Sequence, residues 1–332
     1  MNVLFTGKVN LPFADLITTR LGSNYICRFD ELPPGDSEDP FLSSVKVWVY
    51  GFPALKTMEK LPSLEMIIVP FTGFQQINQE CLEEIKRRKI ILTNTPWNTI
   101  NTAQHNVALL LTVLNRTVEY HNRMRGGDWP KFQQDNQNFP LRHRHIGLLG
   151  YGRIASEIHR MLMPFGCRFS ILNRSGRVPS NPDVLFETCY DSGGLHSFLA
   201  EIDTLIISVP QSDETTGLIG AKELELLGKD AVLINTSRGP VVDEKALYQS
   251  LKDRMIMMAA IDVWYNYHPT PDEFGRKFPW SPDCPFNELD NIILSPHRGA
   301  SPIYNDERWE EVINNIMSFN QSNINEITNR IL

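Results

Sequence analysis

The sequence predicts an α/β protein with two doubly wound parallel sheets, in which one domain is inserted into the other. Short apolar runs alternate with amphipathic segments along most of the chain, which is typical of parallel strands connected by helices. The alternation falls into two blocks, and the second block begins with a glycine-rich turn. A chain of 332 residues is long enough to bury two cores.

The first block lies within residues 1–98. Its expected strands are the apolar runs Val3–Phe5, Val45–Tyr50, Met66–Val69 and Ile90–Leu92. Residues 80–88 have the apolar spacing of a helix. A longer helical pattern runs from Thr102 to Arg125, where two glycines end it.

The second block contains six further apolar runs, enough for the sheet of a complete dinucleotide-binding domain. They are Ile146–Leu149, Phe169–Leu172, Leu205–Val209, Val232–Asn235, Met257–Ile261 and Ile292–Leu294. The tail from Asp306 to Leu332 is expected to form a final helix. We therefore predict a Rossmann-like nucleotide-binding domain over residues 99–294, and a flavodoxin-like substrate domain from residues 1–98 and 295–332.

The composition argues against several classes of protein. The formal net charge is −7, whereas nucleic-acid binding generally needs a basic surface. No stretch reaches the roughly 20 apolar residues that span a bilayer, and the N-terminus lacks the pattern of a signal peptide. The five cysteines are scattered, and His143 and His145 have no cluster of ligands around them, so we expect no disulfide framework and no metal. We expect a cytoplasmic protein without nucleic-acid or membrane partners.

A glycine-rich turn follows the first strand of the second block and begins a helix. The segment from Gly150 to Ala155 has the pattern G-x-G-x-x-G/A, in which the glycines allow a tight turn and close approach of a pyrophosphate. The helix N-terminus would add N–H groups and positive dipole. An alternative is a helix start whose glycines only make a turn. We predict that the cofactor phosphates are bound by Gly150, Tyr151, Gly152, Arg153 and Ile154.

The end of the next strand indicates which cofactor is used. NAD sites usually have Asp or Glu about 20 residues further on, bonded to the ribose 2′-hydroxyl. Asn173 stands in that place, and it would not repel a 2′-phosphate. Arg174 could hold that phosphate through its planar fork, and Ser175 could add a hydrogen bond. We expect NADP to be favoured over NAD, the alternative being that Arg174 is a solvated side chain in a surface turn.

Several motifs of this block resemble those of the D-isomer-specific 2-hydroxyacid dehydrogenase family. They are Gly147–Ile154, Ser208–Pro210, Ile234–Asp243, Ala260–Trp264 and Leu294–His297, with looser matches at Thr95–Asn98, Ala103–His105 and Gly127–Trp129. The resemblance covers most of the chain, with the motifs in the order and spacing of the family. It implies an NAD(P)-dependent enzyme that interconverts a small 2-oxoacid and a D-2-hydroxyacid by hydride transfer, and it implies a homodimer.

The resemblance also implies roles for single residues. Arg238 matches the arginine that binds the substrate carboxylate and polarises the reacting carbonyl, tasks that suit its planar fork. His297 matches the general acid-base, and imidazole titrates near neutral pH. Asp262 matches the residue that orients the nicotinamide carboxamide, and Thr72 with Gly73 matches the loop that binds the substrate carboxylate. Further matches are Asn98 at the substrate, and Val209, Pro210, Thr236 and His297 at the cofactor.

One position departs from the family pattern. The family usually has a glutamate five residues after the Asp262 position, paired with the histidine, and Tyr267 stands there instead. A neighbouring carboxylate raises the pKa of an imidazole, so without it the pKa of His297 should be near or below the ordinary value of about 6.5. Reduction should then weaken as the pH rises through neutrality. Four later carboxylates could replace the missing acid: Asp272, Glu273, Asp283 and Glu288.

Three functions agree with these motifs. The leading one is reduction of a small 2-oxoacid, such as glyoxylate or hydroxypyruvate, by NADPH. A formate- or phosphite-type dehydrogenase of the same superfamily is the second, because formate oxidation needs no proton transfer and Tyr267 replaces the glutamate. A nucleotide-binding regulator or corepressor-like scaffold is the third, although the presence of Arg238 and His297 speaks against lost catalysis.

Overall fold

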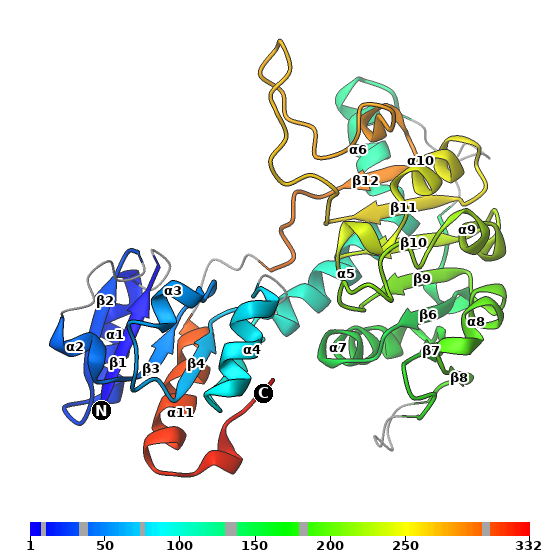
Figure 1. Ribbon diagram of the computed structural model, residues 1–332. Helices are drawn as coiled ribbons and strands as arrows, with labels where there is room; N and C mark the ends of the chain where they lie inside the picture. The colour runs from blue at the N-terminus through cyan, green and yellow to red at the C-terminus, as the bar shows by residue number, and fades with distance from the viewer. Residues whose placement is uncertain (8–10, 33–38, 74–76, 130–137, 179–184, 301–305) are drawn as a thin grey trace. The chain divides into compact units, whose positions relative to one another are not determined.

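The computed structural model describes residues 1–7, 11–32, 39–73, 77–129, 138–178, 185–300 and 306–332. The chain divides into two compact units, Met1–Asn98 with Pro302–Leu332, and Thr99–Ser301. Each unit contains one parallel sheet covered by helices, so the fold is α/β with two Rossmann-like units, as predicted (Figure 1). The second division falls after Ser301 instead of the expected residue 294, because the segment after the last strand is hydrogen-bonded to Asp262 of the same unit.

The sheet of the first unit has five parallel strands in the order β2-β1-β3-β4-β5. They are β1 (Asn2–Thr6), β2 (Ile26–Asp30), β3 (Val45–Val49), β4 (Met66–Val69) and β5 (Ile91–Asn94). Four of them coincide with expected apolar runs. The edge strand β2 was not expected, because its residues alternate charge with apolar side chains and are only half-buried.

Helices cover both faces of this sheet. On one face, α1 (Ala14–Leu21) and α11 (Asp306–Asn320) pack on Val3 and Phe5 of β1. The other face carries α2 (Pro40–Ser43), α3 (Leu55–Met58) and α4 (Gln79–Arg87). The expected helix from Asp306 to Leu332 is wrong beyond Asn320, because the chain turns at Ser322, which has a φ of +61°, and then lies along β5.

The sheet of the second unit has seven parallel strands in the order β12-β11-β10-β9-β6-β7-β8. They are β6 (His145–Leu149), β7 (Arg168–Leu172), β8 (Thr188–Tyr190), β9 (Thr204–Ile207), β10 (Val232–Asn235), β11 (Met258–Ile261) and β12 (Ile292–Leu294). Six were expected. The seventh, β8, has three residues at the sheet edge, too short for an apolar pattern.

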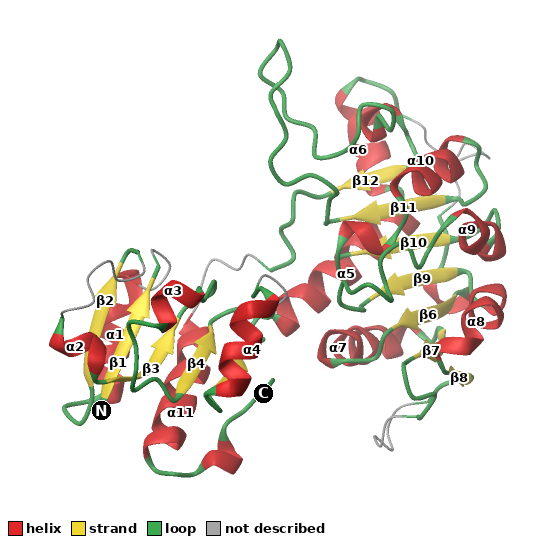
Figure 2. Cartoon of the chain, in the orientation of Figure 1, coloured by secondary structure: helices red, strands yellow, loops and turns green. Residues whose placement is uncertain are grey.

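Helices also cover both faces of the second sheet (Figure 2). One face carries α5 (Thr99–Leu114) and α7 (Arg153–Leu162), and the other carries α8 (Leu195–Glu201), α9 (Ala221–Leu227) and α10 (Glu244–Lys252). The single long helix expected up to Arg125 is wrong. It is divided into α5 and α6 (Thr117–Arg125) by Arg116, whose φ of +51° is incompatible with a continuing helix.

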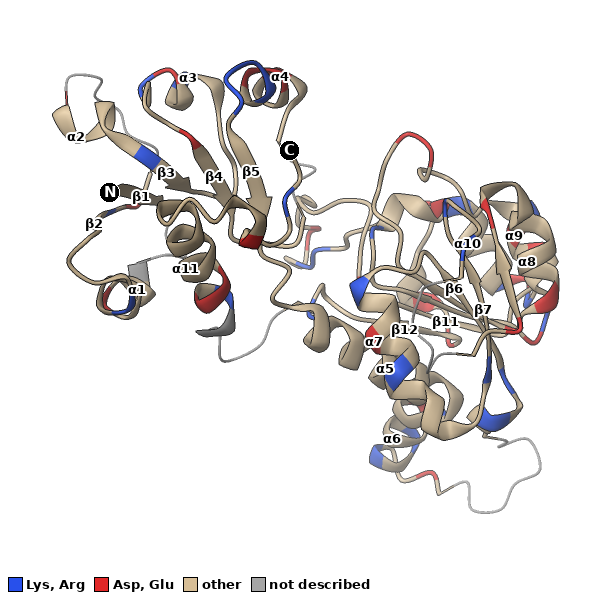
Figure 3. Ribbon diagram, turned by 90° about the horizontal axis from the view of Figure 1, so that it is seen from below, with Lys and Arg blue, Asp and Glu red and all other residues tan. Residues whose placement is uncertain are grey.

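The structure also bears on the charge distribution, on membrane-spanning helices, on the cysteines and on groups of metal ligands. Figure 3 shows basic and acidic residues interspersed in both units. Within the described ranges, no helix has the length and apolar character needed to cross a membrane. The five cysteines are free thiols. Over the same ranges, no three or more His, Cys, Asp and Glu side chains are grouped as metal ligands.

Candidate active site

The glycine-rich turn lies between β6 and α7, where the strand order of the second sheet reverses. Gly150 has a φ of +85°, and a Cβ there would lie 2.8 Å from Cγ1 of Val209 and 3.1 Å from the Ser208 carbonyl oxygen. Gly152 is the N-cap of α7, and a Cβ there would meet no atom within 4 Å. This backbone fits a dinucleotide pyrophosphate, which needs close approach and uncapped N–H groups at a helix start.

The side chains of Tyr151, Arg153 and Ile154 in this turn differ in their contacts and in their exposure to solvent. The Tyr151 hydroxyl is hydrogen-bonded to Nδ1 of His159 (3.1 Å), and its ring packs edge-on against Phe186. Burial lowers the pKa of His159 to about 4, so that imidazole is neutral at pH 7. Arg153 is exposed and Ile154 is half-buried. Because the Tyr151 side chain is held against α7, its part in binding phosphates would come from its backbone.

The turn after β7 is shaped by Asn173. Its Oδ1 accepts hydrogen bonds from the N–H and the hydroxyl of Ser175, both at 3.1 Å, and its Nδ2 donates to the carbonyl of Arg177 (2.9 Å). Arg174 is exposed, and no carboxylate in the described part of the chain pairs with it. Asp191, which follows β8, forms an isolated bridge with Ser175. The sequence did not single out this acidic residue beside the turn.

Arg238 follows β10 in a turn that Asn235 holds. Oδ1 of Asn235 accepts from the N–H (3.0 Å) and the hydroxyl (2.9 Å) of Ser237, and its Nδ2 donates to the Arg238 carbonyl (3.0 Å). A Cβ on Gly239 would lie 2.4 Å from the Trp264 carbonyl oxygen, so glycine is required at that position. The half-buried guanidinium donates to the Ser237 carbonyl (2.6 Å) and, within the described ranges, has no carboxylate partner.

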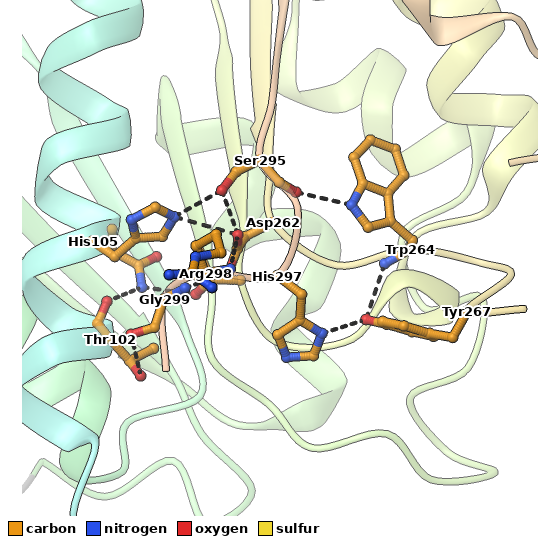
Figure 4. Close-up of polar contacts among 11 residues, drawn as sticks. Thr102, His105, Asp262, Trp264, Tyr267, Ser295, His297, Arg298 and Gly299 are labelled. Carbon is orange, nitrogen blue, oxygen red and sulfur yellow. Dashed lines mark hydrogen bonds and ion pairs between the residues drawn. The ribbon is translucent and has the colours of Figure 1, made fainter. Parts of the chain in front are cut away.

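Asp262 follows β11 directly, and its carboxylate is buried (Figure 4). Oδ1 accepts hydrogen bonds from the Ser295 hydroxyl and the Arg298 N–H (2.7 Å), and Oδ2 accepts from the Gly299 N–H (2.9 Å). Nε2 of His105 lies 3.4 Å from Oδ1. Burial raises the pKa of Asp262, but these four donors outweigh burial and lower it to about 2. The ionised carboxylate therefore holds the turn that follows β12.

His297 lies in that turn with a φ of +58°, which is uncommon for a residue with a side chain. Its Nδ1 lies 2.8 Å from the Tyr267 hydroxyl, whose oxygen also accepts from the Trp264 N–H (3.3 Å). Desolvation lowers the pKa of His297, Asp262 opposes this, and the charge of Arg238 adds to the lowering. The side chain is exposed to solvent, so the desolvation is partial.

Tyr267 therefore contacts the same imidazole that the missing glutamate would contact. The expectation that His297 has lost its partner is only half correct, because the partner is a neutral phenol instead of a carboxylate. The four acidic candidates lie between β11 and β12 in the sequence, the part of the chain that forms a long projecting loop after β11 (Figure 1). Asp272 is paired with Arg276 (2.7 Å). In the described structure, no hydrogen bond or ion pair connects His297 to the other three: Glu273, Asp283 and Glu288.

Two residues of α5 support this site and were not predicted to do so. Nε2 of His105 lies 3.1 Å from the Ser295 hydroxyl, and Nδ2 of Asn106 donates to the Thr236 hydroxyl (2.7 Å). His105 belongs to one of the looser family motifs, and Ser295 to one of the close ones, so the signal was present. The sequence did not reveal that α5 faces the ends of β10 and β12.

The substrate-binding residues expected besides Arg238 belong to the first unit. Thr72 and Asn98 follow β4 and β5, and their side chains are hydrogen-bonded to each other. Nδ2 of Asn94 donates to the Thr72 carbonyl (2.6 Å), and Gly73 continues the same loop. The first sheet thus brings these side chains together at the carboxyl ends of two neighbouring strands.

A buried arginine packs beside this loop. Arg308 on α11 is 7% exposed, and its guanidinium carbon lies 4.4 Å from the ring centre of Trp97 and 5.3 Å from that of Phe71. These rings directly precede Asn98 and Thr72. Burial lowers the pKa of Arg308 to about 10, and none of the described residues accepts a hydrogen bond from it. Sequence reasoning missed this residue.

Comparison with known proteins agrees with this geometry. Residues 107–299 match the family model described as D-isomer specific 2-hydroxyacid dehydrogenase, NAD binding domain. A glyoxylate reductase of Aeropyrum pernix is 33% identical over 250 residues, which cover 74% of this chain and 69% of that protein. The glyoxylate/hydroxypyruvate reductase HPR3 of Arabidopsis thaliana is 32% identical over 243 residues, covering 72% and 68% of the two chains.

A solved structure of a related reductase is similar over almost the whole chain. The NADPH-dependent glyoxylate/hydroxypyruvate reductase of Sinorhizobium meliloti in complex with citrate is 26% identical, with 99% of each chain covered and a TM-score of 0.75. The family match covers more than half of the chain and includes the glycine-rich turn, Arg238, Asp262 and His297. The chain belongs to the D-isomer specific 2-hydroxyacid dehydrogenases, a family of nicotinamide-dependent oxidoreductases, as its motifs predict.

Proposed function

We propose that this protein uses NADPH to reduce a small 2-oxoacid, such as glyoxylate or hydroxypyruvate, to the D-2-hydroxyacid in a reversible reaction. The observation that carries the proposal is the grouping of Arg238, Asp262 and His297 after three neighbouring strands, β10, β11 and β12. Ligands of doubly wound sheets bind at this edge. The relatives named above are glyoxylate and hydroxypyruvate reductases, which supports this class of substrate.

Each side chain would contribute a separate part of the reaction. Arg238 would bind the substrate carboxylate and polarise the reacting carbonyl. Thr72 and Gly73 are proposed as further substrate-binding residues through their N–H groups, in a loop that Asn98 supports through its bond to Thr72. His297 would give a proton to the carbonyl oxygen and take it back in the oxidation. The bound reduced nicotinamide supplies the hydride.

The second unit would hold the dinucleotide. The glycine-rich turn would bind the pyrophosphate, and the remaining contacts would come from Val209, Pro210, Thr236, Asp262 and His297. A preference for NADP is supported by Asn173, which carries no charge, and by Arg174, which lacks a carboxylate partner in the described ranges. Asp191 beside this turn is an argument for NAD, so the two cofactors need direct comparison.

A formate- or phosphite-type oxidation is the weaker candidate. The absence of the family glutamate favoured this function in the sequence. In the structure, however, the Tyr267 hydroxyl is hydrogen-bonded to the imidazole of His297. A histidine engaged in this way is suited to proton transfer, which formate oxidation does not require. We also propose a homodimer, as the family resemblance implies, and sedimentation of the purified protein would measure its mass. A cytoplasmic location is proposed because the scattered, free cysteines suit a reducing compartment.

A spectrophotometric screen tests the proposed function. The protein would be mixed with NADPH or NADH and each member of a panel of 2-oxoacids, and loss of the reduced cofactor would be followed. Formate and phosphite with NADP⁺ and NAD⁺ form the control arm. We expect turnover with at least one small 2-oxoacid and a product of D configuration. Turnover of formate or phosphite alone would reject the proposal.

A further inference from the structure

His297, the proposed proton donor, is hydrogen-bonded to the phenol of Tyr267. The Tyr267 oxygen accepts a hydrogen bond from the Trp264 N–H (3.3 Å) and lies 2.8 Å from Nδ1 of His297 (Figure 4). A phenol has one proton. Of the two arrangements that this contact allows, we take the one in which the phenol donates to Nδ1, because its oxygen already accepts from Trp264. When Nδ1 accepts, the neutral imidazole has its proton on Nε2. The resting imidazole is therefore ready to donate from Nε2.

A neutral imidazole that donates from Nε2 alone would become an anion, which is a poor product at ordinary pH. A glutamate at position 267 would solve this by keeping the imidazole doubly protonated. The Tyr267 hydroxyl solves it in another way, since it can deliver a second proton to Nδ1. The geometry for this transfer is already present, with the donor and acceptor atoms 2.8 Å apart.

We propose that Tyr267 is the second proton donor of the reduction: its phenol proton moves to Nδ1 of His297 as the Nε2 proton moves to the carbonyl oxygen of the substrate. This inference rests on the proposed 2-oxoacid reduction. Tyr267 acts through His297, so it is a positioning and proton-supplying residue, and of these two side chains it is His297 that contacts the substrate.

The transfer is balanced in atoms and electrons. The reduced cofactor supplies hydride, whose electron pair forms the new C–H bond at the carbonyl carbon. The N–H bond at Nε2 breaks and the hydroxyl O–H bond forms, while the phenol O–H bond breaks and the N–H bond at Nδ1 forms. The imidazole ends neutral and Tyr267 ends as a phenolate. Tyr267 is 49% exposed, so water can return one proton to the pair.

The surrounding charges favour this route over direct donation by a charged imidazole. Of the described residues, Arg238 and Asp262 are the charged groups that act on the pair. Burial and the charge of Arg238 lower the pKa of His297, which disfavours imidazolium. Burial raises the pKa of Tyr267, which keeps the phenol protonated, and the charge of Arg238 opposes that rise. Asp262 acts in the opposite direction, but its charge is bound by four hydrogen-bond donors. The Trp264 N–H would also stabilise the phenolate oxygen.

The pH dependence of reduction separates the two routes. A relay works while the phenol keeps its proton. The wild-type kcat/KM should therefore stay level from about pH 6 to about pH 9, in place of the fall through neutrality expected for a histidine without a partner. In Tyr267→Phe the imidazole must be charged to donate. Its kcat/KM should equal that of the wild type near pH 5.5 and fall about tenfold per unit above the ordinary histidine pKa of about 6.5. At about pH 8.5 the deficit should be about 100-fold or more.

Two further variants complete the test. Tyr267→Glu should restore most of the activity at high pH, because a carboxylate keeps the imidazole charged. Tyr265→Phe removes a nearby phenol that packs against Phe286 and makes no hydrogen bond to a described residue, and it should keep the wild-type profile. NADPH affinity, measured by fluorescence titration, should be equal in all four proteins.

The outcomes distinguish the relay from the proposed function. If Tyr267→Phe has the wild-type profile, or is slower by one factor at every pH, the relay is overturned and the 2-oxoacid reductase assignment stands. If the wild type reduces no 2-oxoacid, the proposed function fails and the relay fails with it. A readout independent of turnover is the ¹⁵N NMR spectrum of His297, identified by its loss in His297→Gln. We expect the Nε2–H tautomer in the wild type at about pH 8, and the Nδ1–H tautomer would contradict the relay.

Discussion

Gly239 lies so close to Trp264 that a Cβ on Gly239 would be 2.4 Å from the Trp264 carbonyl oxygen and 2.6 Å from its carbonyl carbon. The obstacle is backbone, so it cannot rotate away as a side chain could. Gly239 follows Arg238 directly, and Trp264 follows Asp262 by two positions. The glycine therefore fixes the distance between the turn with the arginine and the chain that follows β11.

Gly239→Ala should move Arg238 away from its position. We expect a loss of about 1–3 kcal/mol in the free energy of unfolding, as for other overpacked sites, and at least a tenfold fall in kcat/KM. Urea unfolding and steady-state kinetics would measure both. Gly126→Ala is the matched control, since its Cβ would approach no atom closer than 3.4 Å. Wild-type stability and kinetics in Gly239→Ala would contradict this reading of the turn.

Asp262→Asn should destabilise the turn that contains His297. The pKa of Asp262 is lowered from 3.8 to about 2, so its contribution to stability is present above about pH 4 and is lost as the pH falls toward 2. A shift of this size corresponds to about 2 kcal/mol. We expect the variant to unfold more easily than the wild type at pH 7 by about that amount, with the difference shrinking below about pH 4.

The control for this series is a surface acid. Asp272→Asn breaks an exposed pair with Arg276, and it should leave the free energy of unfolding nearly unchanged. Urea unfolding of the three proteins at several pH values would make the comparison. A difference between wild type and Asp262→Asn that is constant from pH 7 to pH 3 would show that the buried charge is not its source.

Arg174→Ala should change the choice of cofactor. The exposed guanidinium is expected to bind the 2′-phosphate, so the variant should lose affinity for NADPH and keep its affinity for NADH. Asp191→Asn is the opposite test, because removing that negative charge beside Ser175 should favour NADPH. Fluorescence titration of both cofactors gives the ratio of dissociation constants. Tighter binding of NADH by the wild type would refute the NADP preference.

Arg308→Met should have little effect on stability. The buried guanidinium has no acceptor among the described residues, and an apolar side chain of similar length avoids the cost of desolvating a charge. Contacts with Trp97 and Phe71 offset part of that cost. We expect the free energy of unfolding to stay within about 1 kcal/mol of the wild type or to rise. A loss of about 3 kcal/mol or more would contradict the absence of a partner.

The parts of the fold that could be predicted are those with a local signal. Buried parallel strands are continuous apolar runs, so β6 and β10 could be located from the sequence. The edge strands β2 and β8 lack such runs, since every residue in these two strands is at least partly exposed. The break at Arg116 could not be located from the sequence, because no glycine or proline marks this left-handed residue.

The residues of the candidate active site that could be predicted are also those with a local sequence signal. Arg238, Asp262 and His297 could be proposed because each follows a strand within a recognisable motif. His105 lies in a recognisable motif, but its contact with Ser295 could not be predicted, because the spacing of apolar residues in α5 does not reveal which strand ends its polar face meets. The contact of Tyr267 depends on the path of an irregular loop after β11, and residue order alone does not encode that path.

The role of Arg238 as the group that binds the substrate carboxylate is tested most directly by single-turnover reduction in protein saturated with NADPH. The best 2-oxoacid of the screen would be used with the wild type, Arg238→Lys and Arg238→Ala. We expect the second-order rate constant of this reduction, taken from the dependence of the single-turnover rate on 2-oxoacid concentration, to fall by about 1,000-fold in Arg238→Ala. The fall should be smaller in Arg238→Lys, and NADPH affinity should be unchanged in both variants. If Arg238→Ala keeps a second-order rate constant near that of the wild type, the proposed active site is contradicted.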